Sequence, residues 1–339
     1  MKYYLGIDLG GTKVSAAVVK VQHGEYTLEK AAVNPVSEIK DSDLLMDKIA
    51  ETVISAIEYA GITKDKISGC GMGVPGVANS GTGVLERAVN LILPNPYPIA
   101  EELEKRLSQK QNSLEVPVIV GNDADCAAFG EYLAGVGKEF REKHNKKHVD
   151  LVCVTLGTGV GSGIVLGGKI HSGFNYSGGE FGHTVIMAEG GRKCGCGRCG
   201  CYEQYAAGTA LKWIGKEAAD KNPGSLINTI AKERRKKIDG EIVFEAAKRG
   251  DETAAAAVER YAGFVACGLV NLINTMQPDI ICIGGGVCAQ KGLLPLIKKK
   301  VNQKQYNRKI GDKNDKTHVC IASLENDAGI IGAAMLCLN

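Results

Sequence analysis

The chain has 339 residues, of which 44% are hydrophobic and 23% are charged, and its formal net charge is +3 at pH 7. This balance argues against a disordered chain, and the small net charge gives no basis for nucleic-acid binding. At this length two domains are expected. The 44 glycines gather in short loops, which favours close approach of backbone to a ligand.

Neither export nor membrane insertion is expected. The opening residues reach Asp8 before an apolar segment of signal-peptide length accumulates, and later apolar stretches are short and broken by glycine or charge. Eight of the twelve cysteines stand singly in apolar segments, as Cys153, Cys267 and Cys282 do. Buried free thiols in a reducing cytosol explain these more simply than disulfides, so we expect a cytoplasmic protein.

Strands and helices alternate through the first part of the chain. The pattern predicts a strand, glycine turn and strand over residues 3–19, an amphipathic helix over 43–60, a strand over 67–74 ending at Pro75-Gly76, a helix over 99–107, a strand over 116–120 and a small-residue helix over 124–134. The strongly basic segment 138–148 is interpreted as a solvated surface insertion.

The second part repeats the strand, glycine turn and strand of the N-terminus. We expect a strand over 150–155, a turn at 157–159, a strand over 161–166, helices from Glu203, Ile242 and Thr253, a strand over 280–283 ending in three glycines, and a small-residue helix from Asp327. The alternation predicts an α/β fold, and the repeat predicts two lobes of similar design. We place a small N-terminal lobe at 1–122 plus 325–339 and a large lobe at 123–324.

Two glycine turns between predicted strands are candidates for phosphate binding. Glycines let backbone N–H groups turn towards phosphate oxygens, Thr12 adds a hydroxyl donor, and Asp8 can hold the cation that accompanies a nucleotide. The first turn is neither a Walker loop nor a dinucleotide fingerprint, and alone it is equally well explained as a tight hairpin turn. The candidate nucleotide-binding residues are Asp8, Gly10, Gly11, Thr12, Lys13, Gly157, Thr158, Gly159, Gly284, Gly285 and Gly286.

The order of these features resembles the actin, sugar kinase and heat-shock ATPase superfamily. The resemblance assigns a first phosphate loop to 8–12, a connecting helix after Asp123, a second phosphate loop to 157–158, an adenosine loop to 284–286 and a closing helix from Asp327. It implies two actin-like (ribonuclease H-like) lobes with a cleft between them. It also implies binding of ATP with Mg²⁺ and lobe closure at hinges near 121–125 and before Asp327.

Four cysteines lie within eight positions of one another, at Cys194, Cys196, Cys199 and Cys201, with glycines that permit a tight knuckle. This spacing suits tetrahedral Zn²⁺, and His183 can supply a nitrogen ligand. A disulfide or redox cluster and a four-cysteine site without His183 are the alternatives.

The same region resembles the signature of the ROK family (repressors, open reading frames and kinases). The family pattern GE-x-GH, then C-x-C-G-x-x-G-C-x-E, appears here as residues 179–183, 194–201 and Glu203. The resemblance implies structural zinc held by His183, Cys194, Cys196 and Cys201. Four protein ligands would leave no position for an activated water. Cys199 departs from the family pattern, and its role stays open.

Asn122-Asp123 follows a predicted buried strand and precedes a helix, where a helix N-cap is the plain interpretation. The family resemblance instead implies that Asn122 binds sugar and that Asp123 is the general base for the attacking hydroxyl. It further implies sugar contacts from Glu180, His183 and Glu203, whose alternatives are surface charge or capping. Gly76 and Asn90 complete the implied sugar-binding set, although the acidic residue that many relatives carry after the Pro-Gly turn is missing.

The expected activity is therefore that of an ATP-dependent hexose kinase, with glucose as the first choice of substrate. N-acetylglucosamine, N-acetylmannosamine and fructose kinases of the same family share these motifs. A repressor would carry a helix-turn-helix before the first loop, which here begins at residue 8, and a non-catalytic sugar sensor could lack Asp123 or the phosphate loops. The resemblance also implies a homodimer or homotetramer, with no nucleic-acid or membrane partner.

Overall fold

The computed structural model describes residues 1–88, 90–109, 112–306 and 316–338. These residues form two compact units, the first made of Met1–Cys153, Gly163–Gly179 and Ala322–Asn339 and the second of Val154–Ser162 and Glu180–Ile321. Helices and strands are mixed throughout, so the predicted α/β class is confirmed. Unit 1 takes in more of the chain than the small lobe that we predicted, and the predicted lobe boundaries stay a prediction.

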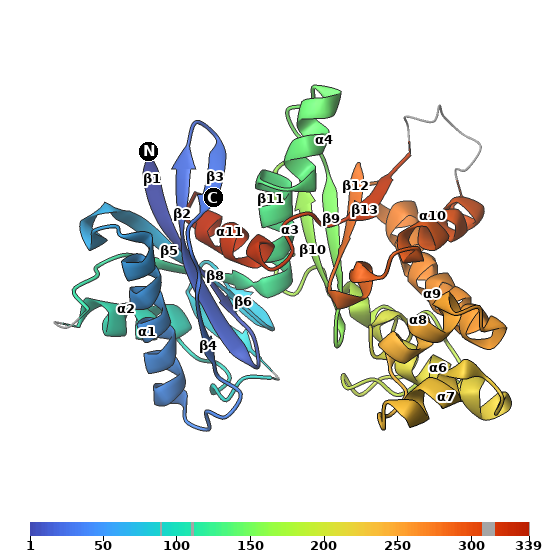
Figure 1. Cartoon of the computed structure of the whole chain (residues 1–339). Helices are drawn as coiled ribbons and strands as arrows, with labels where there is room; N and C mark the ends of the chain where they lie inside the picture. Colours follow the sequence, from blue (N-terminus) through green and yellow to red (C-terminus); the bar gives the residue numbers. More distant parts are fainter. Residues whose placement is uncertain (89, 110–111, 307–315, 339) are drawn as a thin grey trace. The chain divides into compact units, whose positions relative to one another are not determined.

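A six-stranded sheet forms the centre of unit 1 (Figure 1). Its strands are β1 (Lys2–Leu9), β2 (Lys13–Gln22), β3 (Glu25–Leu28), β4 (Ala32–Pro35), β5 (Ile67–Val74) and β8 (Val118–Asn122). They follow the order β3-β2-β1-β5-β8, and β4 also pairs with β2. β5 is parallel to both β1 and β8. The carboxyl ends of these three strands therefore meet at one edge of the sheet.

Helices cover both faces of this sheet (Figure 1). α1 (Ser42–Ala60) and α2 (Ile99–Ser108) pack on one face, and their apolar side chains join those of the strands in a single core cluster. On the other face α11 (Asp327–Met335) contacts β1, β5 and α3 (Asp123–Leu133). The two predicted helices over 43–60 and 99–107 are thus present nearly as expected.

Small residues let α11 approach the sheet much more closely than helices usually do. A Cβ atom on Gly71 of β5 would lie 1.8 Å from the carbonyl oxygen of Ala333 in α11. One on Gly332 of α11 would lie 1.7 Å from the carbonyl oxygen of Cys126 in α3. Neither position has space for a side chain, because two backbones are already in contact there. The prediction of a closely packed small-residue helix from Asp327 is confirmed.

Unit 2 is mainly helical. Its helices are α5 (Glu203–Ala206), α6 (Ala210–Lys221), α7 (Leu226–Glu233), α8 (Gly240–Lys248), α9 (Glu252–Met276) and α10 (Leu293–Lys304). α9 is long and apolar enough to cross a membrane by length and composition, but 61% of its most apolar stretch is buried. It contacts α5, α6, α8 and α10, as the core helix of the unit.

The second sheet has the order β11-β10-β9-β12-β13. Its strands are β9 (Leu151–Leu156), β10 (Val160–Leu166), β11 (Lys169–Ile170), β12 (Ile280–Gly284) and β13 (His318–Ile321). The boundary between the units crosses β9 and β10. The predicted second strand, glycine turn and strand are therefore present.

Several elements were not predicted, most of them short: β3, β4, β11, β13, the hairpin of β6 (Val77–Asn79) and β7 (Val84–Arg87), α4 (Val136–His144), α6, α7 and α10. α4 occupies much of the basic segment 138–148, which is indeed largely exposed. The segment is helical because Val136 and Gly137 are buried at its start and Arg141 donates to the carbonyl oxygen of Tyr132 at 2.6 Å. The helix predicted from Glu203 is short, since α5 ends at Ala206.

Candidate functional site

The carboxyl edge of the unit 1 sheet brings together three of the predicted site segments. Asp8 lies near the end of β1, the Pro75-Gly76 turn follows β5, and Asn122 ends β8. In the parallel register Asp8 pairs with Gly73, and Val74 with Asn122. Polar groups at the carboxyl ends of parallel strands lie where open α/β sheets commonly bind ligands.

Asn122 is the N-cap of α3. The interpretation of Asn122-Asp123 as a helix cap is therefore correct for Asn122. Its Oδ1 accepts from the backbone N–H groups of Ala124 and Asp125 at 2.8 and 3.1 Å. Its Nδ2 donates to the carbonyl oxygen of Gly76 at 2.9 Å, which ties the two strand ends together. A cavity of about 540 Å³ lies beside Asn122, also lined by Lys169.

Asp123 is the first residue of α3 and is half-buried. Its backbone is close to β5, since a Cβ atom on Gly73 would lie 3.5 Å from the Asp123 Cα. The cap at Asn122 fixes the start of α3, so the position of the Asp123 backbone is set by two strands and a helix. A carboxylate carried on a backbone fixed in this way, at a strand end, is suited to accepting a proton from a bound hydroxyl group.

The first glycine turn joins β1 to β2. Gly10 N–H donates to the Lys13 carbonyl oxygen at 2.9 Å, while Gly11, Thr12 and Lys13 are exposed. Asp8 stands behind this turn, where burial raises the pKa of its carboxyl and the nearby Lys13 opposes that shift. The ionised form of such a carboxyl group becomes more favourable when a cation is bound beside it.

Asn90 lies beside the same turn. A Cβ atom on Gly11 would lie 3.4 Å from the Asn90 carbonyl oxygen. The two residues, with Leu91 and others, line a cavity of about 250 Å³. Within unit 1, Asn90 is therefore placed beside the predicted phosphate turn, as well as being a predicted sugar contact.

The second glycine turn, between β9 and β10, meets the third glycine run within unit 2. Gly285 has a φ of 92°, and a Cβ atom there would lie 2.4 Å from the carbonyl oxygen of Leu156, directly before the turn. Gly208 N–H donates to the Gly157 carbonyl oxygen at 2.8 Å, and the Thr209 hydroxyl donates to that of Thr158 at 3.0 Å. The exposed Gly157 and Thr158 are thus held by residues 208–209, and Gly285 packs on Leu156 directly before them.

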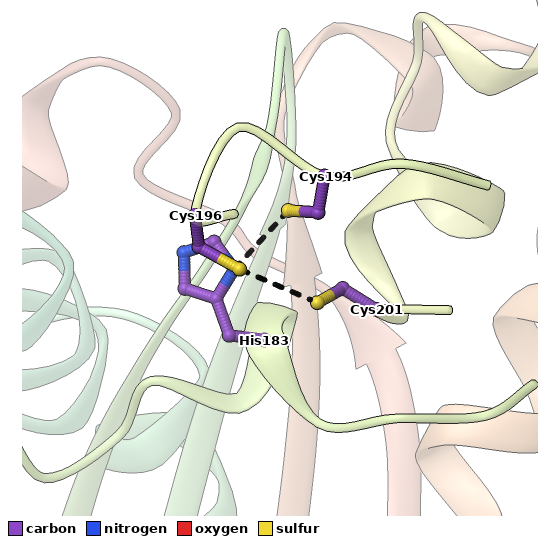
Figure 2. A group of neighbouring side chains, drawn as sticks. All are labelled: His183, Cys194, Cys196 and Cys201. Carbon is purple, nitrogen blue, oxygen red and sulfur yellow. Dashed lines mark hydrogen bonds between the residues drawn. The ribbon is translucent and has the colours of Figure 1, made fainter. Parts of the chain in front are cut away.

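The side chains of His183, Cys194, Cys196 and Cys201 converge in unit 2, as Figure 2 shows. Their ligand atoms all lie within 4.8 Å of one another. His183 Nδ1 is 3.6 Å from Cys194 Sγ, and the Sγ atoms of Cys196 and Cys201 are 3.6 Å apart. We call these four residues the knuckle.

Zinc bonds of the usual length place the ligand atoms of a tetrahedral site about 3.5–3.8 Å apart. Two distances in the knuckle match this spacing, and all four ligand atoms lie close enough to converge on one ion, so the residues suit zinc. Cys199 is exposed, and its backbone bridges to Lys193 outside the knuckle. These positions favour His183 over Cys199 as the fourth ligand.

The thiols of the knuckle sit in unlike surroundings. Hydrogen bonds from the backbone and side chain of Arg198 lower the pKa of Cys196 to about 6. Burial raises the pKa of Cys201 to about 12. A coordinating metal ion deprotonates thiols outright, so a bound cation would hold all three as thiolates despite these different surroundings.

The two predicted sugar-binding carboxylates of unit 2 flank the knuckle. Glu180 is exposed, and its Oε2 is 4.0 Å from His183 Nε2. Glu203 Oε2 accepts from Val160 N–H at 3.1 Å, and its Oε1 is 3.8 Å from Cys194 Sγ. His183 thus directs one ring nitrogen into the knuckle and the other towards Glu180. This arrangement would let one nitrogen bind a metal ion while the other hydrogen-bonds to a second group.

Sequence reasoning missed the residues that support these groups. Tyr202, between Cys201 and Glu203, is fully buried and donates to the Val265 carbonyl oxygen of α9 at 2.9 Å. Thr209 hydrogen-bonds to Thr158 of the second turn, which lies 51 residues earlier in the chain. The buried aromatic between two polar motif residues was the available signal for Tyr202. For Thr209 no local signal exists.

The fold and these groups define an α/β protein of the actin-like sugar kinase class, and comparisons with known proteins agree. The model of the ROK family matches residues 4–339. The chain is 32% identical to a glucokinase from Halalkalibacterium halodurans, over 99% of this chain and 94% of that protein. It is 29% identical to an N-acetyl-D-glucosamine kinase from Salmonella paratyphi B, over 84% of each.

Among solved structures, a ROK family glucokinase from Streptomyces griseus in complex with glucose and AMPPNP is similar, with a TM-score of 0.75. It is 31% identical, and the alignment covers 98% of both chains. This chain belongs to the ROK family. The predicted resemblance and the predicted actin-like two-lobed fold are therefore confirmed.

Proposed function

We propose that this protein is an ATP-dependent hexose kinase that converts glucose and ATP into glucose 6-phosphate and ADP. Full-length similarity to glucokinases supports the activity and the substrate. The observation that carries the chemistry is the half-buried Asp123 directly after β8, with its helix start fixed by Asn122.

In the proposed reaction, Asp123 accepts the proton of the sugar O6 hydroxyl as that oxygen attacks the γ-phosphorus of ATP. The bond from that phosphorus to the β–γ bridging oxygen breaks, and ADP leaves. Asn122, Gly76 and Asn90 would orient the sugar with Glu180, His183 and Glu203. Carboxylates suit this task because one group accepts from two neighbouring hydroxyls.

Nucleotide binding is assigned to the three glycine segments. Backbone N–H groups of Gly10, Gly11 and residues 157–159 would meet phosphate oxygens, with hydroxyls from Thr12 and Thr158 and charge from Lys13. The run at 284–286, which approaches the second turn at Gly285, would accept the adenosine. Asp8 would hold Mg²⁺, which neutralises charge on the phosphates.

The knuckle is proposed to bind structural zinc, because its four side chains lie close together and would complete a tetrahedral shell. By analogy with the family we also propose a homo-oligomer. The many free cysteines among the described residues support a reducing compartment, the cytoplasm.

An N-acetylhexosamine is the second candidate substrate, favoured by the similarity to the Salmonella enzyme. The test is kcat/KM for glucose, mannose, fructose, N-acetylglucosamine and N-acetylmannosamine, measured as sugar-dependent ADP release. Glucose is expected to give the highest value. Preference for an acetylated sugar would reassign the substrate, and no ADP release with any sugar would favour a sugar sensor.

Asp123→Asn tests the assigned base. The change keeps the shape of the side chain but removes its ability to take a proton. We expect kcat to fall at least about 10²-fold, while sugar affinity by calorimetry stays near that of the wild type. A variant that turns over normally would remove Asp123 from this role.

A further inference from the structure

Glu203 connects the knuckle to the second glycine turn. Its two carboxylate oxygens face different groups: Oε2 accepts from Val160 N–H at 3.1 Å, and Oε1 lies 3.8 Å from Cys194 Sγ. The carboxylate also fills the space beside Gly159, where a Cβ atom would lie only 2.4 Å from Oε2. One side chain therefore contacts a metal-ligand candidate, Gly159 of the turn and Val160 at the start of β10.

A second contact reaches the turn from the other side of the knuckle. Gly182 directly precedes His183, and a Cβ atom on it would lie 2.2 Å from the Val160 carbonyl oxygen. Tyr202 N–H donates to the Thr184 carbonyl oxygen at 2.7 Å, which joins the His183 and Cys201 segments. Val160 is thus held between neighbours of two knuckle residues.

The segment that carries Glu203 is itself firmly anchored. The buried hydroxyls of Tyr202 and Tyr261 donate to the carbonyl oxygens of Val265 and Ala206, at 2.9 and 2.7 Å. Further along, Gly208 and Thr209 hydrogen-bond to the turn itself. If Cys201 or His183 moved, residues 157–160 would therefore move with them, because no loose linker separates the two regions.

We propose that Glu203 is a positioning residue for the nucleotide turn, and that metal bound at the knuckle strengthens nucleotide binding even when no sugar is present. This rests on the proposed function, because it takes residues 157–159 to bind ATP phosphates. It goes beyond the sugar contact implied for Glu203, because a knuckle that served only the sugar would leave nucleotide affinity in sugar-free enzyme unchanged.

The test is the Kd of AMPPNP with Mg²⁺, measured by calorimetry without sugar on protein of known zinc content. Zinc-loaded wild type is compared with chelator-treated wild type and with zinc-reloaded Glu203→Ala. Both changes remove a support of the turn, the second by deleting a hydrogen bond to a charged group, so we expect Kd to rise about tenfold or more in both. Glu203→Gln keeps an acceptor oxygen for Val160, and its Kd is expected to stay within about threefold of the wild type.

Glu180→Gln is the matched control, because Glu180 also flanks the knuckle but its carboxylate faces His183. It is expected to weaken glucose binding and to leave the AMPPNP Kd unchanged. Binding linkage adds a second readout: saturating AMPPNP should tighten zinc binding by the same factor in wild type, and not in Glu203→Ala.

The outcomes separate the two proposals. If zinc-loaded wild type binds no AMPPNP, the proposed kinase function fails. If wild type binds AMPPNP equally with and without zinc, and zinc-reloaded Glu203→Ala matches it, the positioning role is overturned while the kinase proposal stands. If circular dichroism shows that chelation unfolds the protein, the zinc-reloaded Glu203→Ala measurement decides the matter alone.

Discussion

The two glycine turns have the same local build but different means of support. Each joins two strands, exposes its tip and is closed by a backbone hydrogen bond, Gly10 N–H to Lys13 and Gly157 N–H to Gly159. Behind the first stands Asp8, which α11 approaches at Gly329: a Cβ atom there would lie 3.3 Å from the Asp8 carboxyl carbon. Behind the second stand Glu203 and the knuckle.

With the proposal above, the difference separates a turn fixed by packing from a turn fixed by a ligand site. The first is backed by Asp8, to which α11 packs closely at Gly329. The second would depend on side chains whose arrangement is complete only when a metal ion holds four ligand atoms together. Packing is present whenever the unit is folded, whereas a metal-dependent support would vary with metal supply.

The largest expected effect comes from filling the close contact of α11. Gly332→Ala places a methyl group where the Cys126 carbonyl oxygen lies within 1.7 Å, so backbones must separate. We expect the free energy of unfolding to fall by about 1–3 kcal/mol or more, measured by urea denaturation. Gly263→Ala in α9, where the only near atom is 3.9 Å away, is the control and should be neutral or slightly stabilising. Equal losses in both would contradict the packing account.

A smaller and more local effect is expected on removing metal from the knuckle. Chelation should speed amide hydrogen exchange about tenfold or more in residues 157–161 and 181–206, because the support of the second turn is lost. Exchange in residues 8–13 should stay as it was, and zinc should restore the original rates. Similar acceleration at both turns would show that they share one support.

The smallest effect concerns the charge behind the first turn. Burial raises the pKa of Asp8, so the stability associated with its protonated form is complete at low pH and is lost as pH rises through that raised value. Asp8→Asn should therefore raise the unfolding free energy at pH 7, and this gain should vanish below about pH 4. Nucleotide binding should weaken in the same variant. A gain that is constant from pH 3 to pH 8 would refute the titration of Asp8 as its cause.

Local patterns were sufficient to predict the elements that carry the site. Apolar spacing predicted α1 and α2, glycines between strands predicted both turns, and the small residues after Asp327 predicted close packing. The clustered cysteines and the family resemblance predicted the knuckle with His183 in it, and the structure brings those same four side chains together. Such features are visible because neighbours in sequence determine them.

Other features depend on partners far away in the chain. The contact of Glu203 with Val160 spans 43 residues, and that of Asn122 with Gly76 spans 46. α4 was not predicted because its sequence is mostly polar and shows no clear apolar stripe at helical spacing. Only its first turn is buried. Strands as short as β11, with two residues, carry too little pattern to recognise.

The close contact between α11 and the first sheet also limits the order in which parts of the protein can fold during synthesis. Gly6 and Gly71 in the early strands meet the carbonyl oxygens of Ile330 and Ala333. During synthesis the strands of the first sheet emerge well before α11, so they must wait for it while the helical unit between them is made. Removing that helix by truncation would therefore leave these strands without the partner that covers this face of the sheet.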